Sequence, residues 1–304
     1  MKFETHQPKR TLINDALIDL STVENEDIYE ILSEAIRLKV AAKVGEINKS
    51  LENKKVALIT NQKIGLAPLT FWLSVCGVGG KPITVPLGGS GLEIFLSSRE
   101  SMEILSRLGI DAFIVQTAME DDASRLYNKL YMPVVNAFDG DSPCDALSML
   151  FSVYESLGKL YGLNVAYVGS GKKVTSTLSA FVKCGMNINF VCPEGDLPDE
   201  DVLAFVRANV QGGVTHDFER ALSAADVVFL SDDFDGAFKL TKEMMKKTLR
   251  LNAVVLHTSP LTGAKDADEN IMDDNRCLIA KCGENLVYIQ SAILELLLCN
   301  NIEY

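Results

Sequence analysis

The sequence predicts an α/β protein built from two doubly wound parallel-sheet domains, and three observations support this. Short apolar runs of strand type, such as 56–59 and 227–230, alternate with segments of helical spacing along the chain. Most of these runs end in a polar or glycine-containing loop that leads into a helix, which is the order of βα units in a parallel sheet. At 304 residues the chain is long enough for two domains that each bury a core. We expect them to cover 1–145 and 146–304.

In the first half, Ser21 and Thr22 are the expected caps of a long helix that ends near Val44. The elements expected after it are a strand at 56–59, a helix at 68–75, a strand at 83–85, a helix at 98–108, a strand at 112–115, a helix at 123–130 and a strand at 134–135. The glycine-rich segment 88–91 is either a mobile lid or only a connection between elements.

The stretch 132–157 connects the two halves and has the clearest local signals. Ser142 is predicted to cap the helix that starts at Pro143, with Asp145 three residues past the cap. Apolar residues then follow at helical spacing to Leu157, so this helix should have one apolar face. Its loop follows a presumed parallel strand, where open α/β sheets place ligands.

The second half repeats the same plan. The expected elements are a strand at 164–168, a helix at 174–183, a strand at 189–192, a helix at 199–209, strands at 227–230 and 253–256, and a final helix at 287–299. The final helix is strongly apolar, so we expect it to dock on the rest of the protein, on the first domain, and not to project into solvent.

Composition points to a soluble cytoplasmic protein. Apolar residues make up 47% and charged residues 23%, and the formal net charge of −12 argues against nucleic acid or an anionic membrane as the main partner. The polar N-terminus is no signal peptide, and no apolar run approaches the roughly 20 residues that span a bilayer. The seven scattered cysteines suggest reduced, mostly buried thiols. No metal-ligand spacing is present, and we expect neither a metal nor a cofactor.

Several strings resemble one known family in their order and spacing. They are residues 133–137 (PVVNA), 142–147 (SPCDAL), 163–171 (LNVAYVGSG) and 225–228 (ADVV), His257 with Pro260, and Glu284-Asn285 with Gln290. Over nearly the whole chain, this pattern resembles the aspartate/ornithine carbamoyltransferase family. The resemblance implies a carbamoyl-phosphate domain followed by an amino-acid domain. It also implies trimers with active sites at subunit boundaries, so we expect a homotrimer or a mixed oligomer with a related subunit.

The residues that bind carbamoyl phosphate in that family do not match. Gln116 and Leu286 stand where the resemblance places arginines, and segment 64–68 lacks the hydroxyls and cations of the family's phosphate loop. Ser142 to Asp145 replaces a His-Pro-x-Gln signature. We therefore expect a catalytically degenerate member that cannot use carbamoyl phosphate and is retained to bind an amino-acid-like ligand or a partner subunit. The alternatives are an active transferase with altered donor chemistry and a purely structural subunit.

No catalytic residue can be assigned from the sequence. The ligand-binding candidates are Gln116, Ser142, Asp145, Lys172, Lys173, Asp232, His257 and Thr258. Each also has a structural interpretation.

Asp139, Asp141 and Asp145 could receive an amine or a cation, or could serve only as turn and cap residues. Lys172 and Lys173 could pair with an anion at a helix start, or could point into water.

His257 could polarise a carbonyl group of a ligand, or could be a hydrogen-bonded structural residue. The bond between Ser259 and Pro260 is a candidate cis peptide, because the family has one at that place.

Overall fold

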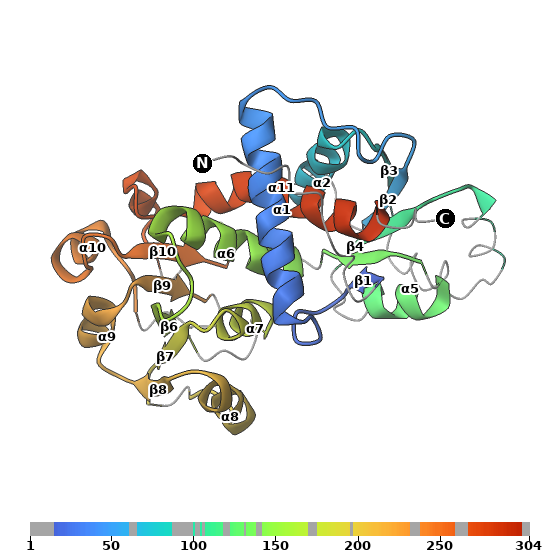
Figure 1. The fold of residues 1–304 in the computed structure, drawn as a ribbon. Helices are drawn as coiled ribbons and strands as arrows, with labels where there is room; N and C mark the ends of the chain where they lie inside the picture. Colours follow the sequence, from blue (N-terminus) through green and yellow to red (C-terminus); the bar gives the residue numbers. More distant parts are fainter. Residues whose placement is uncertain are drawn as a thin grey trace. The chain divides into compact units, whose positions relative to one another are not determined.

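The computed structural model describes residues 15–60, 66–86, 100, 104, 107–117, 122–130, 132–137, 142–169, 175–194, 197–231, 238–258 and 267–299 (Figure 1). The chain divides into two compact units. Unit 1 comprises Met1–Cys144 and Asn285–Tyr304, and unit 2 comprises Asp145–Glu284. Both divisions fall inside a helix, one in α6 (Pro143–Leu157) and one in α11 (Ile279–Leu298).

The described strands of unit 1 form one parallel sheet in the order β1-β5-β4-β2-β3. Their bounds are β1 (Ala16–Leu17), β2 (Lys55–Thr60), β3 (Lys81–Pro86), β4 (Ala112–Gln116) and β5 (Val134–Asn136). Strands β4 and β5 are fully buried, as expected for parallel strands covered on both faces. The sequence did not predict β1, because a two-residue strand carries no readable periodicity.

The described helices of unit 1 are α1 (Asn25–Lys43), α2 (Leu66–Gly77), α5 (Asp122–Leu130) and the part of α11 from residue 285 onward. The predicted capping of α1 by Ser21 and Thr22 is wrong. The helix starts after Glu24, which makes no side-chain cap hydrogen bond, whereas Ser21 and Thr22 donate hydrogen bonds to Asp19. The two hydroxyls therefore stabilise the turn before the helix and not the helix itself.

Helix α11 begins at Ile279, eight residues before the predicted start at 287. The prediction followed the apolar run and missed the first turns, where polar residues and a glycine interrupt the pattern. From Asn285 to Leu298 most of the helix is buried. Within the described ranges, no helix is both long enough and apolar enough to cross a membrane.

The described strands of unit 2 form a second parallel sheet, in the order β10-β9-β6-β7-β8 (Figure 1). Their bounds are β6 (Asn164–Val168), β7 (Asn187–Val191), β8 (Gly212–Thr215), β9 (Val227–Leu230) and β10 (Val254–His257). The positions of β6 and β9 agree with the prediction residue for residue. The edge strand β8 was missed because its first two residues are glycines, which disfavour strands.

The described helices that belong wholly to unit 2 are α7 (Thr175–Lys183), α8 (Glu200–Asn209), α9 (Phe218–Ala224), α10 (Lys242–Thr248) and the 3₁₀ helix η1 (Glu269–Asp273). Neither α9 nor α10 was predicted, since seven residues give little periodicity. Both start at a capping side chain. Asp217 accepts a hydrogen bond from the backbone N–H of Arg220, and Thr241 accepts one from that of Met244.

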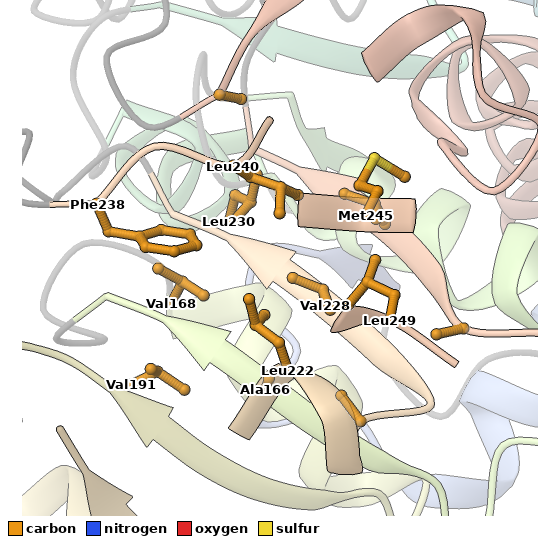
Figure 2. Packing of buried hydrophobic residues seen from close by; sticks show 14 of the residues in the cluster. Ala166, Val168, Val191, Leu222, Val228, Leu230, Phe238, Leu240, Met245 and Leu249 are labelled. Carbon is orange, nitrogen blue, oxygen red and sulfur yellow. The ribbon is translucent and has the colours of Figure 1, made fainter. Parts of the chain in front are cut away.

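One core cluster of unit 2 packs residues of its sheet against helices α9, α10 and η1. Figure 2 shows Val168, Val228 and Leu230 from the sheet beside Leu240, Met245 and Leu249. Unit 1 has its own core cluster, in which Phe113 and Val115 of β4 pack with Leu126 of α5. The predicted fold class, two parallel-sheet α/β modules, is therefore confirmed.

Candidate functional site

Three polar residues end neighbouring strands at the carboxyl edge of the unit 1 sheet. Thr60 ends β2, Gln116 ends β4 and Asn136 ends β5, and all three are buried. Thr60 and Gln116 are paired in register, so their side chains project from the same face of the sheet. Open parallel sheets bind ligands outside this edge. The structure therefore places Gln116 where a ligand-binding residue belongs.

Gln116 differs from its neighbours in its hydrogen bonding. Its side chain is 0% exposed, and among the described residues neither its Nε2 nor its Oε1 atom has a hydrogen-bond partner. Asn136, by contrast, donates from Nδ2 to the carbonyl oxygen of Ile18 over 2.9 Å. Each buried polar group left unpaired costs about 1–3 kcal/mol. Such a residue requires an explanation, and a bound ligand is one.

The segment that starts helix α6 holds two further predicted residues. Ser142 is buried and immediately precedes Pro143, the first residue of the helix, as predicted. Asp145 lies in the first turn and is only half-buried. The carbonyl oxygen of Asp145 accepts a hydrogen bond from the Ser148 hydroxyl over 2.7 Å. The position of both residues fits the start of the helix.

The carboxyl edge of the unit 2 sheet carries the other described candidates. His257 ends β10 and is buried, and the half-buried Thr258 donates its backbone N–H to the carbonyl oxygen of Leu230. Ser231, directly after β9, is 0% exposed, and its hydroxyl has no partner within the described part of the chain. Sequence reasoning did not select Ser231 as a site residue, although its place at the end of a buried apolar run was a usable signal.

Several predicted residues lie outside the described residues. They are Asp139, Asp141, Lys172, Lys173, Asp232, the Ser259–Pro260 bond and the glycine-rich segment 88–91. The predicted opposition of carboxylates and lysines around a ligand therefore stays a prediction.

A second buried polar cluster of unit 1 was not predicted. Glu34 and Arg37 of α1 meet Glu295 of α11, and both carboxylates are nearly inaccessible, at 3% and 4% exposure. Asn48 and Ser50 also donate hydrogen bonds to Glu295. The signal in the sequence was a single glutamate inside the apolar run Ile293 to Leu298. A charge in such a run is buried, so it requires a partner.

The cysteines give no sign of a reactive centre. All seven are free thiols. Burial raises the pKa of the Cys282 thiol to about 12, although a hydrogen bond with Ser152 acts in the opposite direction. Thiols with raised pKa values are poor nucleophiles because the thiolate is the reactive form. Among the described residues, no three His, Cys, Asp or Glu side chains are grouped so that they could hold a metal ion.

Comparison with protein families covers both units. Residues 16–155 match the carbamoyl-phosphate-binding domain of aspartate/ornithine carbamoyltransferases, and residues 161–297 match the Asp/Orn-binding domain of the same enzymes. An ornithine carbamoyltransferase from Desulfotalea psychrophila is 28% identical over 302 residues, which cover 92% of this chain and 98% of that protein. One from Parafrankia sp. is 30% identical over 270 residues, covering 82% of this chain and 85% of that protein.

Comparison with solved structures agrees. The ornithine carbamoyltransferase from Pyrococcus furiosus superposes with a TM-score of 0.81 at 24% identity, over 95% of this chain and 98% of that structure. The ornithine carbamoyltransferase from Thermus thermophilus superposes with a TM-score of 0.79 at 25% identity, over 94% of this chain and 99% of that structure. The matches include both sheets and extend over nearly the full length of each relative. The chain therefore belongs to the aspartate/ornithine carbamoyltransferase family.

Proposed function

We propose that this protein binds a small amino-acid-like ligand and does not use carbamoyl phosphate as a donor. The observation that carries the proposal is the chemistry of Gln116. Its uncharged side chain is wholly buried at the strand end where the family resemblance places an arginine. Leu286, at the second such place, is apolar and 9% exposed. Neither position can supply a positive charge to a phosphate.

The energies of the missing hydrogen bonds support the loss of carbamoyl phosphate binding. A hydrogen bond to a charged group contributes about 1.5–3 kcal/mol. Two missing arginine contacts would therefore weaken phosphate binding by roughly a hundredfold to ten-thousandfold. Residue 116 would also hold an amide oxygen near a dianion, and two acceptors repel each other. An anion therefore gains no charge-assisted hydrogen bond from residue 116 or residue 286.

The alternative is an active transferase with a different donor or a different set of site residues. It is supported by the relatives named above, which are called ornithine carbamoyltransferases and match along the whole chain. In this alternative, cations from other positions replace the missing arginines.

Calorimetry and product analysis separate the two functions. We expect no saturable binding of carbamoyl phosphate up to millimolar concentration, and no ureido product when ornithine or aspartate is added. An authentic ornithine carbamoyltransferase, assayed in parallel, is the positive control. Sub-millimolar affinity for carbamoyl phosphate, or a carbamoylated product, overturns the proposal and supports the transferase.

We also propose that the protein is a homotrimer. The family resemblance implies this assembly, and helix α2 supplies a surface suited to it. Leu69, Trp72 and Leu73 are 52%, 45% and 51% exposed at helical spacing on a helix with no charged residue. Ile83 on the edge strand β3 is also exposed. Apolar surface of this kind usually marks an interface. A mixed oligomer with a related subunit would use the same surface.

A further inference from the structure

We propose that the ligand of this protein carries a neutral carboxamide or urea-type group, and that Gln116 pairs with it. The inference rests on the proposed function, since it names the chemical group that occupies the place of the donor. The observation behind it is the Gln116 amide. Both of its polar atoms are buried, and neither has a hydrogen-bond partner among the described residues.

The pairing follows from the atoms that a glutamine offers. A primary amide presents two N–H donors and one carbonyl oxygen with two lone pairs. A phosphate or carboxylate could accept from Nε2, but its charge would then lie near the Oε1 lone pairs. An ammonium group could donate to Oε1, but Nε2 would stay unpaired. A group with an N–H beside a C=O satisfies both atoms at once, as two amides do when they pair head to tail.

The surroundings favour a neutral group as well. Thr60, in register with Gln116, and Thr117, the next residue, are both buried and uncharged. Neither of these two neighbours supplies a positive charge to balance an anionic ligand. Burial strengthens the selection, because hydrogen-bonding groups shielded from water reject ligands that leave them unpaired.

Gln290, a second buried amide of the same unit, is hydrogen-bonded through its Nε2 atom only, since its Oε1 atom has no partner among the described residues. Its Nε2 donates to the Thr70 hydroxyl over 3.2 Å, between helices α11 and α2. That bond gives Gln290 a role in holding two helices together. Within the described ranges, Gln116 has no such bond to any element, so a structural role does not account for an amide at this position.

The test compares matched ligands by calorimetry and thermal shift. The probes are L-asparagine, L-glutamine and L-citrulline, each beside its charged counterpart L-aspartate, L-glutamate or L-ornithine. We expect at least one neutral member to bind tenfold or more tightly than its counterpart. Ligands that bind only the folded state raise the melting temperature, so binding is visible without any catalytic activity.

Two substitutions assign that preference to residue 116. Gln116→Met keeps the length of the side chain and removes both polar atoms, so the preference should fall at least tenfold. Gln116→Glu keeps the shape but replaces the two donors by acceptors, so the same ligand should bind at least tenfold more weakly. The control is Gln211→Met, at an exposed glutamine of unit 2, which should bind like the wild type. A cooperative unfolding transition in each variant shows that it folds.

Each outcome decides the inference. A preference for neutral ligands that is lost in Gln116→Met and kept in Gln211→Met supports it. Unchanged preference in both Gln116 variants overturns it, while the proposed function stands. If no probe binds and Gln116→Met has a higher free energy of unfolding than the wild type, the unpaired amide only destabilises the fold, and the inference is wrong. Binding of carbamoyl phosphate overturns the proposed function instead.

Discussion

Arg37 of helix α1 donates a hydrogen bond from Nη2 to Oε2 of Glu295 on helix α11 over 3.0 Å, across 258 positions of sequence. The same guanidinium also bonds the carboxylate of Glu34. One cation thus serves two carboxylates, both of which are buried. Burial, together with the hydrogen bond to Glu34, raises the pKa of Glu295 to about 7. The hydrogen bonds from Ser50 and Asn48 act in the opposite direction.

The Glu295 carboxyl predicts a stability that falls as pH rises. The folded protein holds this proton more tightly than the unfolded chain, so the stabilisation is complete below pH 4.5 and is lost as pH rises through about 7. The loss is on the order of 3 kcal/mol in the free energy of unfolding. The glutamine of Glu295→Gln cannot ionise, so the free energy of unfolding of this variant should change less with pH. Between pH 5 and 8 it should therefore rise relative to that of the wild type. Urea unfolding at several pH values measures this.

The control for this prediction is Glu46→Gln, at an exposed residue between α1 and β2. It should leave the pH profile of the wild type unchanged. Parallel profiles for the wild type and Glu295→Gln would show that Glu295 does not titrate in this range.

Replacing Ser231 with alanine should not lower the free energy of unfolding. The buried Ser231 hydroxyl has no partner in the described chain, so Ser231→Ala removes a cost and should raise the free energy of unfolding by up to about 1 kcal/mol. Ser291 is the matched control, since its buried hydroxyl donates to the carbonyl oxygen of Ser74 over 3.0 Å. Ser291→Ala should therefore lower that free energy by about 1 kcal/mol. Equal losses in both variants, by urea unfolding, would mean that Ser231 is hydrogen-bonded in solution.

The two glycines of β8 should respond differently to alanine. A Cβ at Gly212 would lie 2.4 Å from Cγ1 of Val206 and 2.8 Å from the carbonyl oxygen of Ile188, so the α8–β8 contact would have to move. We expect Gly212→Ala to cost about 1–3 kcal/mol. A Cβ at Gly213 meets only Oδ1 of Asn189, at 4.0 Å, so Gly213→Ala should be neutral or stabilising. Equal melting temperatures for the two variants would contradict the packing of α8 on β8.

Trp72 is the single tryptophan of the chain and reports on the proposed trimer. Its indole Nε1 donates to the Thr84 hydroxyl over 2.9 Å, while 45% of the residue is exposed in one chain. Association through α2 would bury the ring, so dilution should shift the emission to longer wavelength. Leu73→Lys should produce a monomer by light scattering, because a lysine in an apolar contact must be desolvated.

Leu251→Lys is the control for that experiment. Leu251 is 87% exposed on unit 2 and lies outside the α2 surface, so the variant should keep the mass of the wild type. A monomeric wild type, or a Leu73→Lys protein of unchanged mass, would refute association through α2.

Much of the candidate site could be located from the sequence, but the hydrogen-bond partners of its residues could not. Gln116 and His257 could be placed at strand ends because buried apolar runs precede them, and Ser142 could be placed at a helix start because Pro143 follows it. Their partners could not be predicted. Whether a buried amide finds a donor or an acceptor depends on what the neighbouring strands and helices bring within about 3 Å of it.

The sequence by itself determined the alternation of strands and helices, the parallel arrangement and the absence of charge at residues 116 and 286. These features depend on local periodicity and on residue chemistry, which any stretch of chain displays without its neighbours. Only the tertiary structure decided that Gln116 is buried beside Thr60, that Arg37 reaches Glu295, and that β1 and β8 are strands. Each of these depends on contacts between segments far apart in the chain. Short strands, in particular, are stabilised by the longer strands they pair with and not by their own residues.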